Sequence, residues 1–340
     1  HNLIMVNNSN LLNQSSFILG VPGSGKSFSA KELITFLALS TDDDIIICDP
    51  EGEYTQLVKA LGGEVIDISA GSKNHINAMD MVEGYGENTN PVIDKAEFVL
   101  SLFEQLDRKP LNAKEKSIID RCTSLVYEDY NRTKIMPTLV DLRQKLLEQP
   151  EAESKDLALS LELFTSGSLN VFAHKTNVNT SSRILSYDIY NLGKQLKNLG
   201  LLVITDAILN RVNENFRKGK KTHLIIDEIH ILYANEYSRM FLNSAWRQYR
   251  KRNACPVAIT QNADYVLSSV ESSTMLSNSE FIVMFNQATN DRERLASLLN
   301  ISEEQMSYIT NSDAGCGLIK YQNLLVPFVN DFPKDTKLYR

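Results

Sequence analysis

A glycine-rich octet between an apolar run and a helical pattern constrains this chain more than any other feature. Residues 17–19 are apolar, residues 20–27 read GVPGSGKS, and residues 28–39 are rich in helix-forming residues. Glycines let successive backbone N–H groups converge on a phosphate, and the N-terminus of the following helix faces the same anion. The octet therefore predicts a nucleotide site formed by Gly20, Val21, Pro22, Gly23, Ser24, Gly25, Lys26, Ser27 and Phe28.

Two residues of the octet have separate expected roles. The ammonium group of Lys26 would hold the β- and γ-phosphates, and the hydroxyl of Ser27 would bind Mg²⁺. We therefore expect ATP and Mg²⁺ as ligands. The alternative is a glycine-rich turn followed by Lys-Ser by chance, and it leaves the strand before the octet and the helix after it unexplained.

An acidic pair at the end of a second apolar run supplies the other half of the predicted site. Residues 222–226 read THLII, typical of a buried parallel strand, and are followed by Asp227 and Glu228. Asp227 is expected to hold Mg²⁺ through water, and Glu228 to polarise the water that attacks the γ-phosphate. Because transfer of a phosphoryl group to another acceptor needs no water activator, the pair predicts an ATPase.

Two histidines flank the acidic pair. His223 and His230 are seven residues apart across the junction of a strand and a loop, where they share no face for a tetrahedral zinc site. We expect His230 to support a neighbouring group or an interface, and His223 to stand at the start of the strand.

The apolar run at residues 45–48 also ends in carboxylates, within the sequence DPEGEY. Ligands of open α/β sheets bind at the carboxyl ends of strands. Glu51 stands between a rigid proline and a glycine, which suits a side chain directed into the site, so we expect Glu51 to sense or orient the γ-phosphate. For Asp49 and Glu53, capping of the following helix is the alternative.

A polar end also follows the apolar run at residues 256–260. The chain continues there with Gln261 and Asn262, whose amides suit a sensor of the γ-phosphate. We assign this role to Gln261. An N-cap for the next helix is an equally supported alternative.

The middle of the chain has a different pattern from its flanks. Strand signals stop near residue 90, helical patterns occupy residues 93–106, 113–130, 138–148 and 153–164, and strands are expected to resume at residues 171–173 and 184–187. One ATP site needs Lys26 before this stretch and Asp227 after it. We therefore predict a core formed by residues 1–89 and 166–340, with an all-helical insertion at residues 90–165.

Composition excludes several classes of protein. Apolar residues make up 43% of the 340 residues and charged residues 23%, which is typical of a folded soluble protein and not of a disordered or collagen-like chain. With 35 basic and 42 acidic residues, the charge of -7 argues against a surface that binds polyanions throughout. The four cysteines lack paired spacing, which predicts reduced thiols in the cytoplasm. No window offers the roughly 18 to 20 apolar residues of a membrane span, and the missing initiator Met leads us to expect part of a longer chain.

Five segments occur in an order typical of one family: GVPGSGKSFSAKE, IIICDPEGEY, HINAMD, HLIIDEIHIL and AITQNADYVL. Through them the chain resembles, from about Leu11 to Phe328, the motor domain of the type IV secretion and conjugal-transfer traffic ATPases. This VirB-four or TrbE/CagE family belongs to the HerA/FtsK class of ATPases. The resemblance implies an α/β fold with a RecA-like P-loop NTPase core and an N-terminal partner domain outside this sequence. The chain departs from the family at Asn77-Ala78, where Asn-Pro is frequent, so the role of that loop is open.

The resemblance also implies an arginine that reaches the γ-phosphate of a neighbouring subunit, from a position between the acidic strand and the strand that ends at Gln261. A basic cluster at residues 247–252 lies there, near the end of a helix that begins at about residue 236. Arg250 is the first candidate and Arg252 the second, and capping of the helix C-terminus is the alternative role. Further candidates are Arg183, Arg292 and Arg294.

These expectations describe an ATP-hydrolysing motor that powers substrate translocation, or the assembly of a pilus or channel, in a type IV secretion or conjugation system. Its expected place is the cytoplasm, peripheral at the cytoplasmic membrane through other channel components. We expect a hexameric ring of copies, with a monomer or dimer in isolation, and DNA as a candidate partner. The alternatives are a DNA-pumping ATPase, such as a coupling protein or HerA-like translocase, and a noncatalytic assembly factor ordered by nucleotide.

Overall fold

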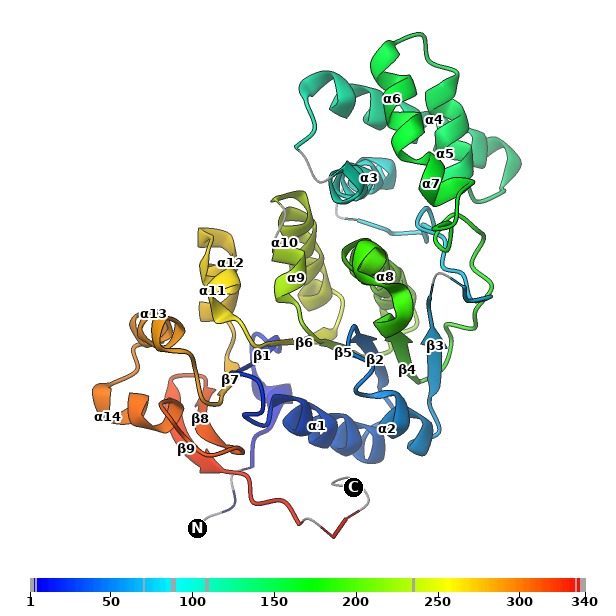
Figure 1. Cartoon of the computed structure of the whole chain (residues 1–340). Helices are drawn as coiled ribbons and strands as arrows, with labels where there is room; N and C mark the ends of the chain where they lie inside the picture. Colours follow the sequence, from blue (N-terminus) through cyan, green and yellow to red (C-terminus); the bar gives the residue numbers. More distant parts are fainter. Residues whose placement is uncertain are drawn as a thin grey trace.

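A mixed sheet forms the frame of the molecule, which we describe from a computed structural model over residues 3, 5–69, 71–86, 90–107, 110–233, 236–333 and 335–336. In this part of the chain the sheet has nine strands in the order β3-β4-β2-β5-β6-β1-β7-β8-β9 (Figure 1). Neighbours from β3 to β7 are parallel, and β8 and β9 form an antiparallel hairpin at one edge. The strands are β1 (Ser16–Leu19), β2 (Asp44–Asp49), β3 (Glu64–Asp67), β4 (Ile184–Asp188), β5 (Thr222–Ile226), β6 (Ala254–Thr260), β7 (Phe281–Met284), β8 (Cys316–Tyr321) and β9 (Leu324–Val329).

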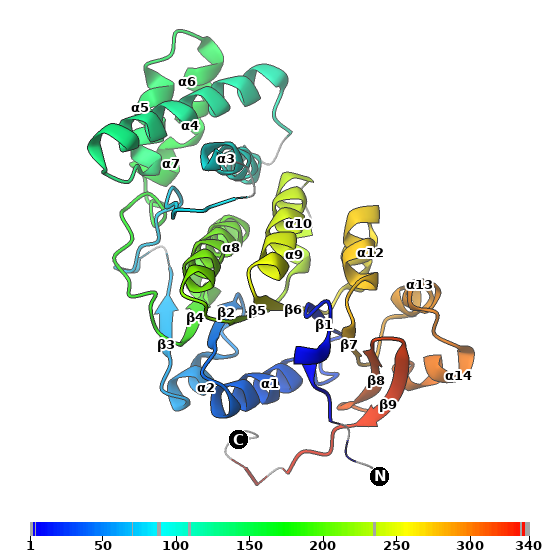
Figure 2. The ribbon, with the colours of Figure 1, turned by 180° about the vertical axis from the view of Figure 1, so that it is seen from behind.

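Helices cover both faces of this sheet. Figures 1 and 2 show α1 and α2 on one face and α8, α10, α11 and α12 on the other. Among the helices that the structure describes, none has both the length and the apolar character needed to cross a membrane. The helices are α1 (Lys26–Ser40), α2 (Thr55–Ala60), α3 (Pro91–Asp107), α4 (Ala113–Thr133), α5 (Leu139–Leu147), α6 (Ala152–Ser160), α7 (Glu162–Thr165), α8 (Lys194–Arg217), α9 (His230–Tyr233), α10 (Glu236–Lys251), α11 (Ala263–Leu267), α12 (Val270–Ser277), α13 (Thr289–Leu299) and α14 (Glu303–Met306), with 3-10 helices η1 (Asn8–Asn10), η2 (Tyr190–Leu192) and η3 (Ser307–Ile309).

The central strands are apolar because helices cover them on both sides. Every residue of β1, β2 and β6 is buried, and most residues inside these strands are apolar, although β2 begins and ends with an aspartate. The edge strand β9 instead has no fully buried residue, and Leu324, Pro327 and Val329 are exposed. The α/β fold class with a mostly parallel sheet, which the sequence predicts, is confirmed.

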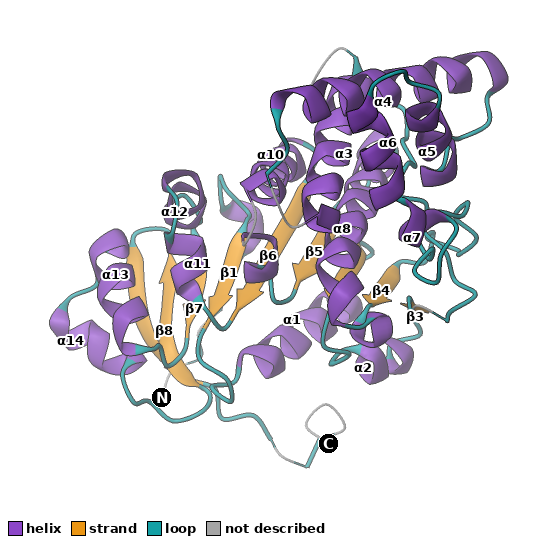
Figure 3. Cartoon of the chain, turned by 45° about the horizontal axis from the view of Figure 1, so that its top comes forward, coloured by secondary structure: helices purple, strands orange, loops and turns teal. Residues whose placement is uncertain are grey.

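Helices α3 to α7 follow one another with no strand between them among the described residues (Figure 3). They lie on the far side of α8 and α10 from the sheet (Figures 1 and 2). The helix α4 begins at a capping box, in which the Asn112 side chain accepts hydrogen bonds from the N–H groups of Lys114 and Glu115. The helix α3 packs against α10, where the rings of Phe98 and Phe241 are 5.5 Å apart. The division of the chain into a core and an insertion at residues 90–165 stays a prediction, and residues 87–89 at its first boundary lie outside the described residues.

The prediction of a strand at residues 171–173 is wrong. These residues form a turn, in which the N–H of Ala173 donates to the carbonyl of Asn170 at 3.0 Å. Their side chains are all buried in the main apolar core. A short apolar run therefore indicates that its residues are buried, and burial alone does not distinguish a strand from a turn.

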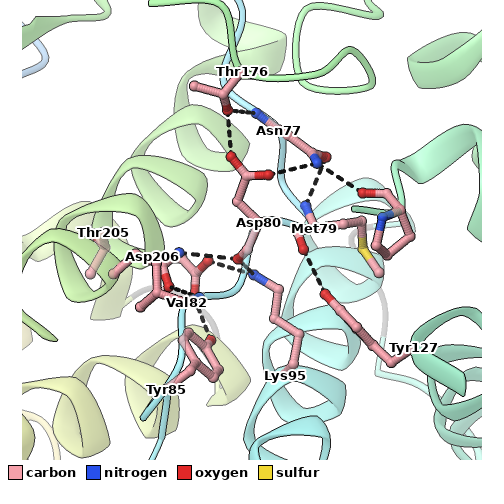
Figure 4. A network of polar contacts seen from close by, with 12 residues as sticks. Asn77, Met79, Asp80, Val82, Tyr85, Lys95, Tyr127, Thr176, Thr205 and Asp206 are labelled. Atoms are coloured by element: carbon pink, nitrogen blue, oxygen red, sulfur yellow. Dashed lines mark hydrogen bonds and ion pairs between the residues drawn. The ribbon is translucent and has the colours of Figure 1, made fainter. Parts of the chain in front are cut away.

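A buried ion pair joins α3 to α8 (Figure 4). The ammonium group of Lys95 lies 2.6 Å from Oδ2 of Asp206, and neither side chain is more than 3% exposed. Tyr85 donates its hydroxyl hydrogen to Oδ1 of Asp206, and Lys95 also donates to the backbone carbonyl of Asp80. Charged groups so deeply buried stay ionised only when partners satisfy them, so this pair fixes how the two helices meet.

The loop that contains Asn77 lies against the same helices (Figure 4). The amide nitrogen of Asn77 donates to Oδ1 of Asp80 and to the carbonyl of Pro137, each at 2.8 Å, and Thr176 donates to Oδ2 of Asp80. The side chain of Ala78 is fully buried. The role left open by the Asn-Ala sequence is thus structural in part, because Asn77 ties this loop to the segment that leads into α5.

Candidate nucleotide site

The glycine-rich loop connects β1 to α1, at the carboxyl end of a strand in the middle of the sheet. Gly23 and Gly25 have φ values of 75° and 112°, in the left-handed region that residues with a Cβ rarely adopt. A Cβ on Gly25 would also lie 3.2 Å from the backbone nitrogen of Gly315. Both the backbone conformation and the close approach therefore require glycine, as the octet predicts.

Segments from the other end of the chain hold this loop. The N–H of Val21 donates to the carbonyl of Asn286 at 2.8 Å, and the N–H of Gly315 donates to the carbonyl of Ser24 at 3.0 Å. A Cβ on Gly20 would lie 2.8 Å from the Cβ of Phe285. Sequence reasoning missed Phe285, Asn286 and Gly315, and no motif in the sequence signals them.

Lys26 is the first residue of α1, and its side chain is mostly buried beside the loop. Its ammonium group donates to the carbonyl of Val21 at 3.1 Å. Burial lowers the pKa of Lys26, while the negative charges of Glu228, Asp227 and Glu53 oppose this effect. The lysine and these carboxylates therefore share one site.

Asp227 follows the last residue of β5 and is buried. It accepts hydrogen bonds from the hydroxyl of Tyr54 at 3.1 Å and from the N–H of Glu228 at 2.8 Å. Burial raises the pKa of Asp227 to about 7, and the neighbouring charge of Glu228 adds to this effect. A buried carboxylate with a raised pKa is suited to a cation, because a positive charge would stabilise its ionised form.

Glu228 has a left-handed backbone conformation with φ of 48°. Its Oε2 atom lies 2.8 Å from Nδ1 of His230, and the Glu228 side chain is 13% exposed. The negative charge of Glu228 acts to raise the pKa of Lys26 and that of Asp227. The structure thus brings Lys26 together with Asp227 and Glu228, which lie about two hundred residues further along the sequence.

Glu51 and Glu53 have different surroundings. The carboxylate of Glu51 forms an ion pair with Lys197 on α8 and is 41% exposed. The negative charge of Glu53 instead acts to raise the pKa of Lys26 and that of Asp227. The role of Glu51 as a sensor stays a prediction, and Glu53, for which helix capping is the alternative, is the carboxylate of the DPEGEY motif whose charge acts on the site.

Gln261 follows Thr260, the last residue of β6, and its side chain is exposed. The carbonyl of Thr260 accepts the N–H of Gly20 at 3.3 Å, so this strand end lies beside the glycine loop. Asn262 occupies the N-cap position of α11 without a capping hydrogen bond from its side chain. The sensor role of Gln261 stays a prediction.

The candidate arginines differ in their surroundings. Arg250 is in the last turn of α10, which leads into the start of β6, whereas the glycine loop lies at the ends of the strands. Arg252 donates to the carbonyls of Gly84 and Gly86. The remaining candidates are Arg183, which donates to the carbonyls of Ala38, Thr41 and Asp43, Arg294, which pairs with Asp264, and Arg292 in the first turn of α13.

Phe28, the last residue of the predicted phosphate site, lies in the first turn of α1. Its ring contacts that of Phe332 edge to face, with centroids 5.1 Å apart. Asn330 donates from its side chain to Glu32 on the same helix. The segment after β9 thus packs along the beginning of α1.

Comparison with solved structures shows the same fold in proteins of low sequence identity. VirB4 of Thermoanaerobacter pseudethanolicus matches with a TM-score of 0.86 and 22% identity, over 98% of this chain and 94% of that chain. The bacterial conjugative coupling protein TrwB matches in an unbound form with a TM-score of 0.62 and 14% identity, over 96% and 87% of the two chains. TrwB in complex with the ATP analogue ADPNP gives 0.62 and 16%, over 94% and 87%. The RecA-like P-loop NTPase fold that the resemblance implies is confirmed.

Comparison of sequences identifies the family. None of the curated protein sequences matches the chain. The family model described as "Helicase HerA, central domain" matches residues 3–236, more than half of the chain. The chain therefore belongs to the family of the HerA helicase central domain, with a P-loop NTPase fold.

Proposed function

We propose that this chain is the motor of a type IV secretion or conjugation system and that it hydrolyses ATP to move substrate or to assemble the channel. The observation that carries the proposal is the meeting of Lys26, Asp227 and Glu228 beside one glycine loop. The fold shared with VirB4 and with the conjugative coupling protein TrwB, together with the five segments of sequence, supports the biological setting.

The residues at the site suit Mg²⁺ and ATP. Ser27 offers a hydroxyl oxygen and Asp227 a carboxylate oxygen, the donors that Mg²⁺ prefers, and bound Mg²⁺ would supply positive charge to the phosphates. Lys26 would exchange its contact with the Val21 carbonyl for the β- and γ-phosphates. Glu228 would then accept a proton from the attacking water, with Gln261 and Glu51 or Glu53 orienting the γ-phosphate region.

Charge on the leaving phosphate needs a cation besides Lys26, and we assign this role to Arg250 of a neighbouring subunit, with Arg252 as second choice. The proposal therefore includes a hexameric ring. It also includes contacts with other channel components at the cytoplasmic face of the membrane and, as a candidate, with DNA.

The test is steady-state release of phosphate from ATP with and without Mg²⁺. We expect turnover that requires Mg²⁺ and is abolished in Lys26→Ala, together with loss of ATP affinity measured by calorimetry. Binding of ATP without release of phosphate would instead support a noncatalytic assembly factor.

Membership of the HerA family favours a DNA-pumping ATPase as the second candidate. The same assay distinguishes it. Stimulation of turnover by double-stranded DNA, which weakens as salt rises, would favour the pump, whereas turnover independent of DNA would favour the secretion motor.

A further inference from the structure

The carboxylate of Glu228 lies close to an imidazole that the proposed chemistry does not use. Oε2 of Glu228 is 2.8 Å from Nδ1 of His230, and the two side chains are 13% and 20% exposed. Among the described residues, no group donates a well-oriented hydrogen bond to this buried oxygen. The 2.8 Å contact makes His230 a polar neighbour at hydrogen-bonding distance from this oxygen, with a geometry that alignment of the two side chains would complete.

The backbone brings these two residues together. Glu228 has φ of 48°, a left-handed conformation that is unfavourable for a residue with a side chain. The N–H of Ile229 donates to the carbonyl of Ile259, and the N–H of Ile231 to the carbonyl of Glu228, each at 3.1 Å. This turn between β5 and α9 is therefore held against β6, and it places residues 228 and 230 side by side.

The ring of His230 has two further neighbours, one of them at the same Nδ1 atom. Nδ1 lies 3.3 Å from Oγ1 of Thr260, and the ring centroid lies 5.7 Å from that of Tyr265. Thr260 ends β6 and precedes Gln261. His230 therefore lies between Glu228, which follows β5, and the end of β6 that adjoins the glycine loop.

Electrostatics explain why such a neighbour is useful. Glu228 is the foremost negative charge acting on Lys26. A carboxylate free to rotate would be drawn towards the ammonium group, and the pair would neutralise the charge that phosphate binding requires. A contact with His230 holds one carboxylate oxygen away from the lysine.

We propose that His230 is a positioning residue, which holds Oε2 of Glu228 so that the other carboxylate oxygen faces the water to be activated. The inference rests on the proposed ATPase function. It assigns no contact between His230 and ATP.

The experiment compares kcat and KM for ATP in the wild-type chain and in three variants, His230→Ala, His230→Asn and His230→Gln. We expect His230→Ala to lower kcat by roughly tenfold to a hundredfold, as misplacement of a reacting group does, and to leave KM and calorimetric ATP affinity unchanged. The amide of Asn can take the place of Nδ1, whereas that of Gln corresponds to Nε2, so His230→Asn should recover most of the rate and His230→Gln should not. His223→Ala is the matched control, because His223 lies on β5, seven residues before His230, and pairs with Asp43 through Nε2 at 2.9 Å.

A second measurement uses the Glu228→Gln background under single-turnover conditions. If His230 acts through Glu228, adding His230→Ala should cause no further loss of rate. An equal loss in both backgrounds, an unchanged or higher kcat in His230→Ala, or equal rates in the Asn and Gln variants would overturn the inference. Absence of turnover in the wild-type chain would overturn the proposed function itself, which keeps the two failures distinct.

Discussion

The hydroxyl of Tyr54, immediately before α2, donates a hydrogen bond to Oδ2 of Asp227 over 3.1 Å, although the two residues belong to distant parts of the chain. Tyr54 is completely buried. Its hydrogen bond stabilises the ionised carboxylate, but burial outweighs it and raises the pKa of Asp227 to about 7. The proposed metal ligand is therefore a carboxylate that is poorly stabilised without a cation.

Asp227→Asn should stabilise the protein at high pH in magnesium-free buffer. Because the folded protein holds the Asp227 proton more tightly than the unfolded chain does, the contribution of this group to the free energy of unfolding falls as pH rises from about 4 to about 7. Asn has no such dependence. We expect a higher midpoint of chemical denaturation for the variant at pH 8 and little difference at pH 4.5. The exposed Asp67→Asn serves as the control, and an equal gain at both pH values would contradict the prediction.

Glu228→Gln should bind ATP normally and hydrolyse it slower by a factor of roughly 10² to 10⁴, because the amide keeps the size of the side chain but cannot accept a proton. Calorimetry and phosphate release measure the two quantities. Glu51→Gln should have a small effect, since Glu51 pairs with Lys197. Near-normal turnover in Glu228→Gln would move the role to Glu51 or Glu53, and Glu53→Gln then becomes the variant to compare.

Arg250→Ala tests whether Arg250 acts at the ATP site of a neighbouring subunit. If Arg250 serves the site of a neighbouring subunit, the variant should bind ATP normally and hydrolyse it poorly. If it serves only as a cation at the end of α10, stability should fall by roughly 0.3–1 kcal/mol and turnover should persist. Mixing the variant with excess Lys26→Ala protein under conditions of ring assembly should restore some activity, because a mixed interface pairs an intact loop with an intact arginine. No recovery despite demonstrated co-assembly would exclude Arg250.

The buried ion pair of Figure 4 leads to a prediction about stability. Lys95→Met leaves the carboxylate of Asp206 without its cation, which should lower the free energy of unfolding by about 3–5 kcal/mol. Urea denaturation measures this change. The matched control is Lys114→Met, because Lys114 pairs with Glu153 at the surface and should have no measurable effect. A similar, small effect of both variants would show that Asp206 accommodates the loss by taking up a proton.

The parts of the fold that follow from local pattern could be predicted. The apolar runs at residues 45–48 and 222–226 are buried strands, and the octet lies between β1 and α1. Each of these features depends on the properties of neighbouring residues, namely burial on both faces or a backbone conformation open to glycine. Asp227 and Glu228 could also be predicted, because an ATPase site at the end of a strand needs one carboxylate for Mg²⁺ and another for the attacking water.

The features that depend on contacts between distant segments could not be predicted. Nothing in the sequence around Gly315 indicates that its N–H supports the glycine loop. The rigidity of Pro50 favours Glu51 over Glu53 as the sensor of the γ-phosphate. In the structure Glu51 pairs with Lys197, which belongs to a helix far along the chain. Residues 171–173 have the composition of a strand, yet no strand pairs with them in the described part of the sheet.

The position of β1 has a consequence for biosynthesis. Phe17 pairs with Ala258 on one side and with Ile282 on the other, so both partners of this strand are made long after it. Until residue 260 has left the ribosome, β1 and the loop that follows it have no sheet to join. Contacts of such large separation in sequence form slowly and late. A nascent chain would therefore be unable to bind nucleotide through most of its translation, and the exposed apolar strand would depend on chaperones for that interval.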